Sequence, residues 1–315
     1  MTPRLRVFGV DYQFLSCGDV FTRGLAAAAS ELGLDYRHAD CLASDLDKQI
    51  LRHHPDLVFV VHGRKFARRY GNAFRDLHTA IWLLDEPYEV DDTSRFSANF
   101  THAFLSDPAT LDRHEHSTSL PVCYDPYVHT PSSAPRPYPV GFIGGGNRTR
   151  DRYLAALVKA GLLGYVIGGA WTSPEVSRIC VSRNVLPNET AARYQSTRIV
   201  LNVFRETHHF NTQKVPATSL NPRVYEAFAC GALVVSEWRP EADRLVPEMP
   251  VFHSEDECVS LITDLLAQPD KAEAIRLACW ARIRPHTYTA RLRTVLEVCG
   301  LRQPTFPEGV TAWPT

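Results

Sequence analysis

The segment NPRVYEAFACGALVVSE, residues 221–237, predicts a helix that turns directly into a buried strand. Asn221 is a favourable helix N-cap and Pro222 suits the first helical position, while Gly231 stands where a helix needs a left-handed residue to end. After Gly231 the run from Ala232 to Val235 has no polar alternation, which is typical of a strand covered on both faces. The segment therefore predicts one helix–strand unit of a parallel sheet.

The same alternation of strand and helix extends over most of the chain and predicts an α/β fold with doubly wound parallel sheets. A length of 315 residues suits two such domains. Thr130 to Pro139 carries four prolines and no hydrophobic periodicity, so it is the predicted linker. We expect a Rossmann-like first domain over residues 1–133, a Rossmann-like second domain over 134–285, and a crossover helix with a tail over 286–315. The predicted strands include residues 5–10, 57–61, 80–84, 101–105, 140–143, 165–167 and 199–203.

Composition is that of a soluble globular protein, with 44% hydrophobic and 22% charged residues. No apolar run approaches the ~18 residues of a membrane span, and the N-terminus enters a strand pattern without a signal peptide, so we expect a cytoplasmic protein. Eight scattered cysteines, without CxxC or zinc-site spacing, indicate reduced thiols in or near the core. A formal net charge of -1 argues against a general polyanion binder.

Glu226 is a carboxylate in an otherwise apolar helix, and Arg223 lies one turn before it. In one interpretation the two form an exposed ion pair, worth roughly 0.2 to 0.5 kcal/mol. In the other, Glu226 accepts hydrogen bonds from the two hydroxyls of a ribose, and Arg223 neutralises a diphosphate near the helix N-terminus. Composition alone favours the first interpretation.

The order polar-Pro-Arg-x-x-Glu-Ala-x-Ala-x-Gly-Ala, followed by an apolar strand, resembles the nucleotide-sugar segment of GT-B glycosyltransferases. It is most similar to the group named after the spore-maturation protein CgeB. The resemblance implies two Rossmann-like domains facing a cleft, with a last helix that crosses back to the first domain. It also implies a hexosyl- or pentosyltransferase whose donor is a nucleotide sugar, with a UDP sugar expected, and whose Glu226 and Arg223 bind ribose and diphosphate.

A glycine run, Gly144 to Gly146, follows one predicted strand and precedes a helix, which lets backbone N–H groups approach a phosphate. A tight turn is the alternative, and the spacing matches neither GxGxxG nor a P-loop. In the resemblance an arginine follows this turn, matched by Arg152 and more weakly by Arg148. The expected donor-binding residues are Gly144, Gly145, Gly146, Arg152, Asn202, Arg205, Asn221, Arg223 and Glu226.

A second candidate site segment, Asp85 to Glu89, follows a buried strand at the sheet edge where parallel sheets place ligands. An acidic loop without a function is the alternative, but the resemblance includes an Asp-x-Pro segment, matched by Asp85 and Pro87. If the reaction inverts the anomeric carbon, Asp85 is the expected base, with His62 and Asp11 as further candidates. If it retains, that role disappears. Many retaining members carry a second glutamate eight residues before the ribose-binding one, and here that position is Thr218.

No metal cofactor is expected, because arginine and helix N-terminal amides can stabilise the departing diphosphate. The polar loop from Phe204 to Leu220 is long, which is typical of functional loops, and the resemblance implies that it lies over that diphosphate. Its His208 and His209 are weak metal-ligand candidates, since adjacent histidines usually point apart.

The acceptor stays open, because acceptor loops vary independently of the fold. A glycan, a small molecule, a protein and a hydroxylated DNA base are all candidates. A basic window gives DNA some support, although a solvated helix surface explains most of it. A catalytically silent nucleotide-sugar-binding module and a nucleotide-sugar epimerase are the alternatives to a transferase. The basic window consists of Arg64, Lys65, Arg68, Arg69 and Arg75.

Overall fold

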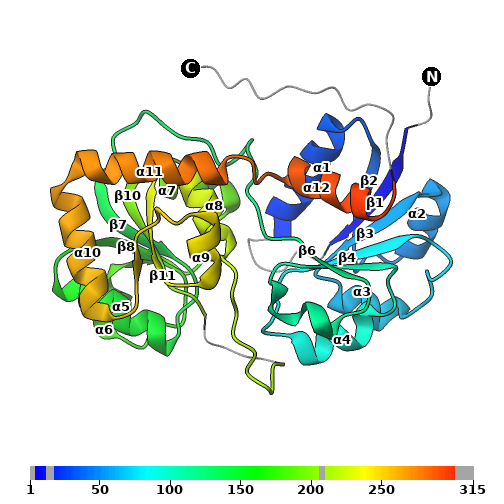
Figure 1. Ribbon diagram of the computed structural model, residues 1–315, viewed down its shortest axis with the longest axis horizontal. Coiled ribbons are helices and arrows are strands. Elements are labelled where there is room, and N and C mark those ends of the chain that lie inside the picture. Colours follow the sequence, from blue (N-terminus) through cyan, green and yellow to red (C-terminus); the bar gives the residue numbers. More distant parts are fainter. Residues whose placement is uncertain (1–3, 12–17, 206–209, 302–315) are drawn as a thin grey trace.

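The computed structural model describes residues 4–11, 18–205 and 210–301. These residues form two lobes, each built around a six-stranded sheet with helices on both faces (Figure 1). The first sheet has the strand order β2-β1-β3-β4-β5-β6 and the second has the order β12-β11-β10-β7-β8-β9. All the neighbouring strands pair in parallel. The predicted doubly wound α/β fold is therefore confirmed.

The elements of the first lobe are β1 (Arg6–Asp11), α1 (Gly18–Glu31), β2 (Asp35–Asp40), α2 (Leu46–His53), β3 (Leu57–Val61), α3 (Arg64–Tyr70), β4 (Thr79–Leu83), α4 (Val90–Ser97), β5 (His102–Leu105), the 3₁₀ helix η2 (Pro108–Arg113) and β6 (Ser117–Ser119). Those of the second are β7 (Tyr138–Ile143), α5 (Arg148–Lys159), β8 (Leu163–Ile167), α6 (Pro174–Ile179), β9 (Cys180–Ser182), α7 (Pro187–Gln195), β10 (Thr197–Asn202), α8 (Pro222–Ala229), β11 (Leu233–Glu237), α9 (Pro240–Leu245), β12 (Val251–Phe252), α10 (Glu255–Ala267) and α11 (Pro269–Ile283). The last helix is α12 (Tyr288–Val298).

Residues 221–237 form the predicted helix and strand, α8 and β11. Asn221 is the N-cap residue of α8 and has an extended backbone. Gly231 follows the end of α8 with a φ of +81°, a conformation in which a residue with a side chain would be strained. Val224 and Phe228 are fully buried in the core between the helix and the second sheet. This unit therefore aims the N-terminus of α8 at the carboxyl ends of the strands.

Strand order reverses once in each sheet, between β1 and β3 in the first and between β7 and β10 in the second. In open parallel sheets, ligands bind beyond the carboxyl ends of the strands at such a switch point. His62 follows β3, whereas Gly144 and Asn202 lie at the ends of β7 and β10. The topology thus assigns one crevice to each lobe.

Helix α12 returns the chain from the second lobe to the first, as predicted, and lies beside α1 (Figure 1). Leu292 and Val295 are fully buried in the core of the first lobe. Arg291 fixes the crossing, because its guanidinium donates hydrogen bonds to the backbone carbonyls of Pro121 and Val122 at 2.6 and 3.1 Å. The last helix therefore ties the two lobes together.

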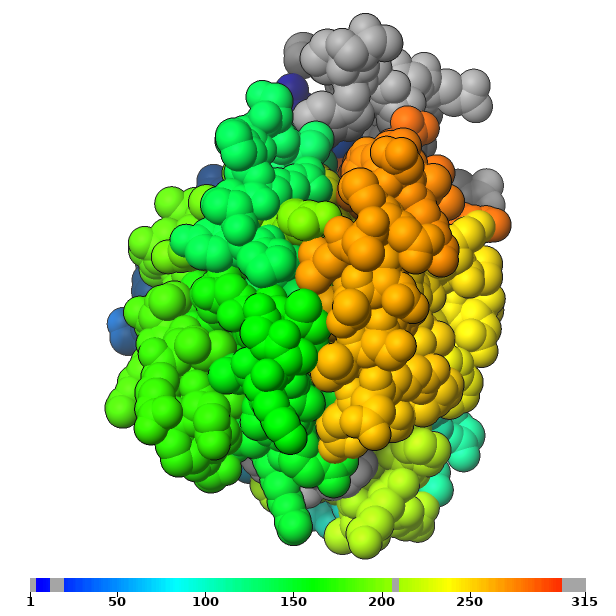
Figure 2. Space-filling model, turned by 90° about the vertical axis from the view of Figure 1, so that its left-hand side faces the viewer, coloured from blue at the N-terminus to red at the C-terminus, as the bar shows by residue number. Residues whose placement is uncertain are grey.

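Helices α10 and α11 cover part of the outer end of the second lobe, where α10 lies beside α5 (Figure 2). Sequence periodicity did not show the short edge strands β6, β9 and β12, since two or three residues carry no pattern. Among the described residues, no helix is both long and apolar enough to cross a bilayer. All seven described cysteines are free thiols, and six are buried, as predicted.

Candidate functional site

A cavity of about 700 Å³ lies between the lobes, at the carboxyl ends of strands from both sheets. Its second-lobe wall includes residues that follow β7, β8 and β10 together with the start of α8. Its first-lobe wall includes residues that follow β4 and β5. The volume falls within the ~300 to 1,000 Å³ of small-molecule sites. Of the predicted site residues, it brings together Asp85, Gly144, Gly145, Arg205, Asn221, Arg223 and Glu226.

Glu226 faces this cavity from α8, and its side chain is 16% exposed. The Arg223–Glu226 ion pair of the simpler interpretation does not form in the structure. Among the described residues, the basic side chain within ion-pair distance of Glu226 is the imidazole of His129, with Nε2 3.9 Å from Oε1. The backbone N–H of Asp125 donates to His129 Nδ1 at 3.3 Å, so the neutral ring carries its proton on Nε2, toward Glu226. The carboxylate thus keeps acceptor capacity for a ligand.

Arg223 is anchored at the ends of β7 and β10. Its Nε donates to the carbonyl of Ile143 at 2.9 Å, and its Nη1 donates to Asn202 Oδ1 at 2.5 Å. Asn202 is fully buried and does not line the cavity, so the structure places it behind Arg223 as a support. Two buried atoms of the same wall, Ser219 Oγ and Asn221 Oδ1, have no hydrogen-bond partner among the described residues.

Arg150, not Arg152, is the α5 arginine that reaches the cavity. Arg152 is 60% exposed on the outer face of α5, where its Nε lies 2.7 Å from Glu255 Oε1, because two residues along a helix turn a side chain by about 200°. Arg150 donates to the carbonyls of Val203 and Gly145 at 3.0 and 2.8 Å. The sequence does contain a signal that separates Arg150 from Arg152. Counting helical turns from Asn147, the N-cap of α5, puts the two arginines on different faces of the helix.

Burial and, after it, the positive charges of Arg223 and Arg205 lower the pKa of Arg150 to about 9. Neither Arg150 nor Arg223 forms an ion pair with any described carboxylate. Two part-buried like charges without a carboxylate partner are unfavourable, and an anion between them would relieve the repulsion. The wall is therefore built to receive negative charge.

The surroundings of the glycines in the run Gly144 to Gly146 differ. At Gly146 a Cβ would lie 2.3 Å from the carbonyl oxygen of Ala170, so this glycine permits close approach of two turns. At Gly145, which lines the cavity, a Cβ would meet nothing within 4 Å. Gly146 does not line the cavity, and none of the three has a positive φ. Close packing, rather than a strained turn, explains Gly146.

Asp85 stands on the opposite wall, just after β4, and is held by two partners. Arg205 crosses from the second lobe, with its Nη2 2.6 Å from Asp85 Oδ1, and stacks on the ring of Tyr88 at 4.2 Å. His62 Nδ1 lies 3.7 Å from Asp85 Oδ2. Both Asp85 and Arg205 also line a second cavity of about 290 Å³ at the switch point of the first sheet, together with His62. The Arg205–Asp85 ion pair therefore separates the two cavities.

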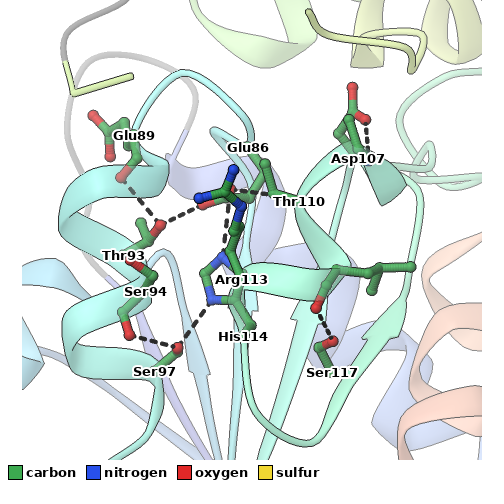
Figure 3. Close-up of polar contacts among 12 residues, drawn as sticks. Glu86, Glu89, Thr93, Ser94, Ser97, Asp107, Thr110, Arg113, His114 and Ser117 are labelled. Atoms are coloured by element: carbon green, nitrogen blue, oxygen red, sulfur yellow. Dashed lines mark hydrogen bonds and ion pairs between the residues drawn. The ribbon is translucent and has the colours of Figure 1, made fainter. Parts of the chain in front are cut away.

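The other two carboxylates of the Asp85 loop have different surroundings. Glu86 is buried and accepts hydrogen bonds from the hydroxyls of Thr93 and Thr110 at 2.5 and 2.7 Å, with His114 Nε2 at 3.5 Å (Figure 3). Glu89 lines the second cavity, and its Oε2 lies 2.9 Å from Arg64 Nη2. Burial, followed by the charge of Asp85, raises the pKa of Glu89. Glu86 therefore stabilises the loop, which leaves Asp85 and Glu89 beside open space.

Asp11 is not brought to either cavity. Its carboxylate is buried, with Oδ1 2.7 Å from His38 Nε2, and its Oδ2 accepts a hydrogen bond from Thr22. Because both oxygens are engaged inside the first lobe, Asp11 lacks access to a ligand. The structure therefore does not place Asp11 with the other candidate residues, and a role for it as a base stays a prediction.

The described parts of the loop from Phe204 to Leu220 dock on the first lobe. Phe210 exchanges backbone hydrogen bonds with Tyr88 and Asp91 at 3.0 and 2.8 Å. His208 and His209, the metal-ligand candidates of this loop, lie outside the described residues. The loop therefore connects the donor-side wall with the loop that carries Asp85.

One described group near the cleft has metal-ligand chemistry, formed by His62, Asp85 and Glu89, whose ligand atoms lie within 4.8 Å of one another. Arg205 and Arg64 are paired with its two carboxylates at 2.6 and 2.9 Å. Because these cations occupy the carboxylate oxygens, they compete with a metal ion for the same positions.

Comparisons with known proteins agree with this architecture. A family model described as glycosyl transferase-like matches residues 148–297. No curated protein sequence shows a significant match to the chain.

Solved structures match nearly the whole chain. An alpha-glucosyltransferase in complex with UDP-glucose and DNA containing an abasic site has a TM-score of 0.66 at 11% identity, over 95% of this chain and 100% of that one. A glycosyltransferase from Rickettsia africae has a TM-score of 0.59 at 12% identity, over 94% and 98%. A putative UDP-N-acetylglucosamine 2-epimerase from Listeria monocytogenes has a TM-score of 0.57 at 8% identity, over 94% and 96%.

At sequence identities of 8 to 12%, likeness to these solved structures shows the fold alone. The chain has the GT-B fold of these glycosyltransferases, and residues 148–297 are similar to the glycosyl transferase-like family. The narrower resemblance to the CgeB group is not distinguished by these comparisons and stays a prediction.

Proposed function

We propose that the protein is a glycosyltransferase that transfers a sugar from a nucleotide-sugar donor to a hydroxyl group of an acceptor. The donor lies in the 700 Å³ cavity, with its nucleotide against the second lobe. A UDP sugar is the expected donor, since an alpha-glucosyltransferase of this fold is described in complex with UDP-glucose. The acceptor approaches from the first lobe.

The observation that supports this proposal most is the pairing of an unneutralised arginine group with an accessible carboxylate in one cavity. Arg150 and Arg223 have no carboxylate partner among the described residues, and they lie at the beginnings of α5 and α8, where helix N-termini also favour anions. Glu226 lies one turn further along α8, lines the same cavity and has carboxylate oxygens that can accept hydrogen bonds from a ligand. A diphosphate joined to a ribose diol offers the complementary charges and donors.

Catalysis in this proposal uses Asp85 as the base of an inverting reaction. Asp85 takes the proton of the acceptor hydroxyl, whose oxygen attacks the anomeric carbon while the bond to the diphosphate oxygen breaks. The negative charge that develops on the diphosphate is stabilised by Arg150 and Arg223. Thr218 offers no carboxylate for the retaining pattern, so the inverting outcome is preferred.

Arg205 controls the availability of this base. In the empty protein it binds Asp85 Oδ1, yet it also lines the donor cavity next to the other arginines. A bound diphosphate competes with Asp85 for Arg205, because it offers more negative charge at the same position. Donor binding thereby frees Asp85 and connects the donor cavity with the 290 Å³ cavity, where the acceptor hydroxyl enters.

No metal is required by this mechanism, because arginines supply the charge that a divalent cation would otherwise supply. The control is to measure donor turnover with and without a chelator. Equal rates are expected, and a loss of turnover that added Mg²⁺ or Mn²⁺ restores would overturn metal independence.

The acceptor class is left to a screen of glycans, small molecules, proteins and hydroxymethylated DNA. The basic window gives DNA less support than its composition indicates. Arg64 pairs with Glu89 and Asp92 at 2.9 and 2.6 Å, and Arg69 donates to the carbonyls of Cys41 and Ala43 at 3.2 and 2.7 Å. These cations serve the fold of the first lobe, which leaves fewer for a phosphate backbone.

The experiment is a thermal-shift and turnover panel with UDP-, GDP-, ADP- and dTDP-sugars. It compares the wild type with Glu226→Ala and with Glu297→Ala, an exposed glutamate of α12 as the control. Stabilisation by one nucleotide class, lost only in Glu226→Ala, together with sugar release or transfer, supports the transferase. An epimerised nucleotide sugar would identify an epimerase instead, and binding without any product would identify a silent binding module. No shift with any donor would refute all three.

A further inference from the structure

His78, His102 and Cys299 meet at the amino ends of the strands of the first sheet, the ends opposite to those that line the donor cavity. His78 directly precedes β4, His102 begins β5, and Cys299 is the C-cap of α12. One ligand atom from each of them lies within 4.8 Å of the other two. The two imidazole ring centroids are 5.5 Å apart. Three segments distant in sequence thus converge with their nitrogen and sulfur atoms.

One of these atoms lacks a partner. His78 Nε2 is buried and has no hydrogen bond to any described residue. Buried nitrogen atoms without partners are rare in folded proteins, so this one requires an explanation. Ring packing against His102 accounts for the carbons of the imidazole but leaves the nitrogen unsatisfied. A ligand between the three side chains would satisfy it.

The ligand atoms of this group are not taken up by cations. None of the three side chains forms an ion pair with a described residue. The group His62, Asp85 and Glu89 differs, because Arg205 and Arg64 pair with its carboxylates. A divalent ion at the His78 group would therefore not have to displace an arginine.

We propose that His78, His102 and Cys299 form a structural zinc site. Two imidazoles and one thiolate suit Zn²⁺, which prefers tetrahedral nitrogen and sulfur ligands. The fourth position takes a water molecule or the neighbouring His116. Tetrahedral bonds of about 2.0 to 2.3 Å place ligand atoms roughly 3.3 to 3.6 Å apart, so each atom moves by less than about 1 Å from its present position.

Zinc binding here would fasten the crossover helix to the first sheet. The Cys299 thiol releases its proton as the Zn–S bond forms, and the imidazoles bind through their unprotonated nitrogens. Because Cys299 ends α12 while His78 and His102 belong to the sheet, the metal would resist detachment of the helix that joins the two lobes. The site is independent of the proposed transferase chemistry.

The test uses the full-length protein, freed of metal by dialysis against a chelator and then titrated with Co²⁺ or Zn²⁺. Co²⁺ should give a thiolate-to-cobalt charge-transfer band that saturates at one equivalent. One equivalent of Zn²⁺ should displace the Co²⁺. Zn²⁺ at a hundredfold excess over its Kd should raise Tm by roughly 5 °C.

Cys299→Ser should abolish the charge-transfer band, whereas Cys279→Ser, which alters an equally buried thiol of α11, should keep it. His78→Asn should weaken binding at least tenfold. The wild type alone can refute the proposal, so the result does not depend on the variants folding. Absence of the band together with an unchanged Tm, or a band that persists in Cys299→Ser, would overturn it.

Discussion

The contact between Glu226 and the ribose diol gives the sharpest prediction for the donor site. Glu226→Ala should weaken UDP binding, and the loss should depend on the ribose hydroxyls. On wild-type protein, 2′,3′-dideoxy-UDP should also bind more weakly than UDP. On Glu226→Ala the two nucleotides should bind alike, because the acceptor for the hydroxyls has been removed.

The expected size follows from the surroundings of the carboxylate. Glu226 is only 16% exposed, so water screens it weakly, and the His129 imidazole, 3.9 Å away, is beyond hydrogen-bond distance of its oxygens. Two hydrogen bonds to this charged acceptor contribute about 1 to 1.5 kcal/mol each, net of the water they displace. The total of about 2 to 3 kcal/mol corresponds to a ~30- to 150-fold change in Kd.

Isothermal titration calorimetry of the four protein–nucleotide pairs gives the coupling energy as a double-mutant cycle. A coupling of about 2 kcal/mol or more supports the ribose contact. If Glu226→Ala weakens UDP and dideoxy-UDP by equal factors, the side chain acts on the fold of α8 or on another part of the ligand. The reasoning about the diol would then be refuted, whatever the affinity of the wild type.

Three further predictions address other groups. Arg150→Met should weaken UDP binding at least tenfold, since a charge-assisted contact is lost, whereas Arg152→Met on the outer face of α5 should leave Kd unchanged; calorimetry measures both. Asp85→Asn should lower the kcat of transfer about 10²- to 10⁴-fold while UDP Kd changes less than threefold, and an unchanged kcat would remove Asp85 as the base. Burial raises the pKa of Glu241 from 4.5 to about 7. Between these values the folded state binds a proton that the unfolded state has released, so the free energy of unfolding falls as pH rises. Glu241→Gln should therefore flatten the profile of Tm between about pH 5 and 8.

Much of the fold could be predicted because its signals are local. Pro222 and Gly231 mark the two ends of α8, and the continuous apolar run after Gly231 marks a strand buried on both faces. The order of such units along the chain then limits the topology to doubly wound sheets. The short edge strands escaped prediction, because neither periodicity nor turn residues identify a strand of two or three residues.

The candidate site was less predictable, since it depends on which side of an element a residue faces. Arg150 and Arg152 are the same residue type, two positions apart. Only their positions around the axis of α5 separate the residue that faces the cavity from the exposed one. Asp11 and Asp85 both follow strands of the first sheet, yet His38 and Thr22 enclose Asp11. Partners of this kind come from distant parts of the sequence, so no local pattern reports them.

The position of Thr218 shows how the two lobes share one site. The resemblance to retaining GT-B members implies a glutamate at this position, where the chain has Thr218, and in the structure the carboxylate of Asp107 from the other lobe contacts it. Asp107 accepts hydrogen bonds from the backbone N–H groups of Thr218 and Ser219 at 2.6 and 2.8 Å and from the Thr218 hydroxyl at 2.6 Å. The loop before α8 is therefore shaped by closure of the cleft.

The contacts of Asp107 connect the wall of the donor cavity in the second lobe with the first lobe, from which the acceptor is proposed to approach. Glu241 holds the same loop from the second lobe, because it accepts a hydrogen bond from the backbone N–H of Leu220 at 2.6 Å. Opening of the cleft would break the three contacts of Asp107 but keep those of Glu241, whose backbone N–H also donates to the carbonyl of Thr218 at 3.0 Å. Of these contacts, Ser219 would then lose its only one, whereas Thr218 would keep one. Since Ser219 also lines the donor cavity, the shape of that wall must change with the distance between the lobes. A donor that fits this wall therefore favours the arrangement of the lobes seen here, in which Asp107 contacts the loop, while its diphosphate draws Arg205 away from Asp85.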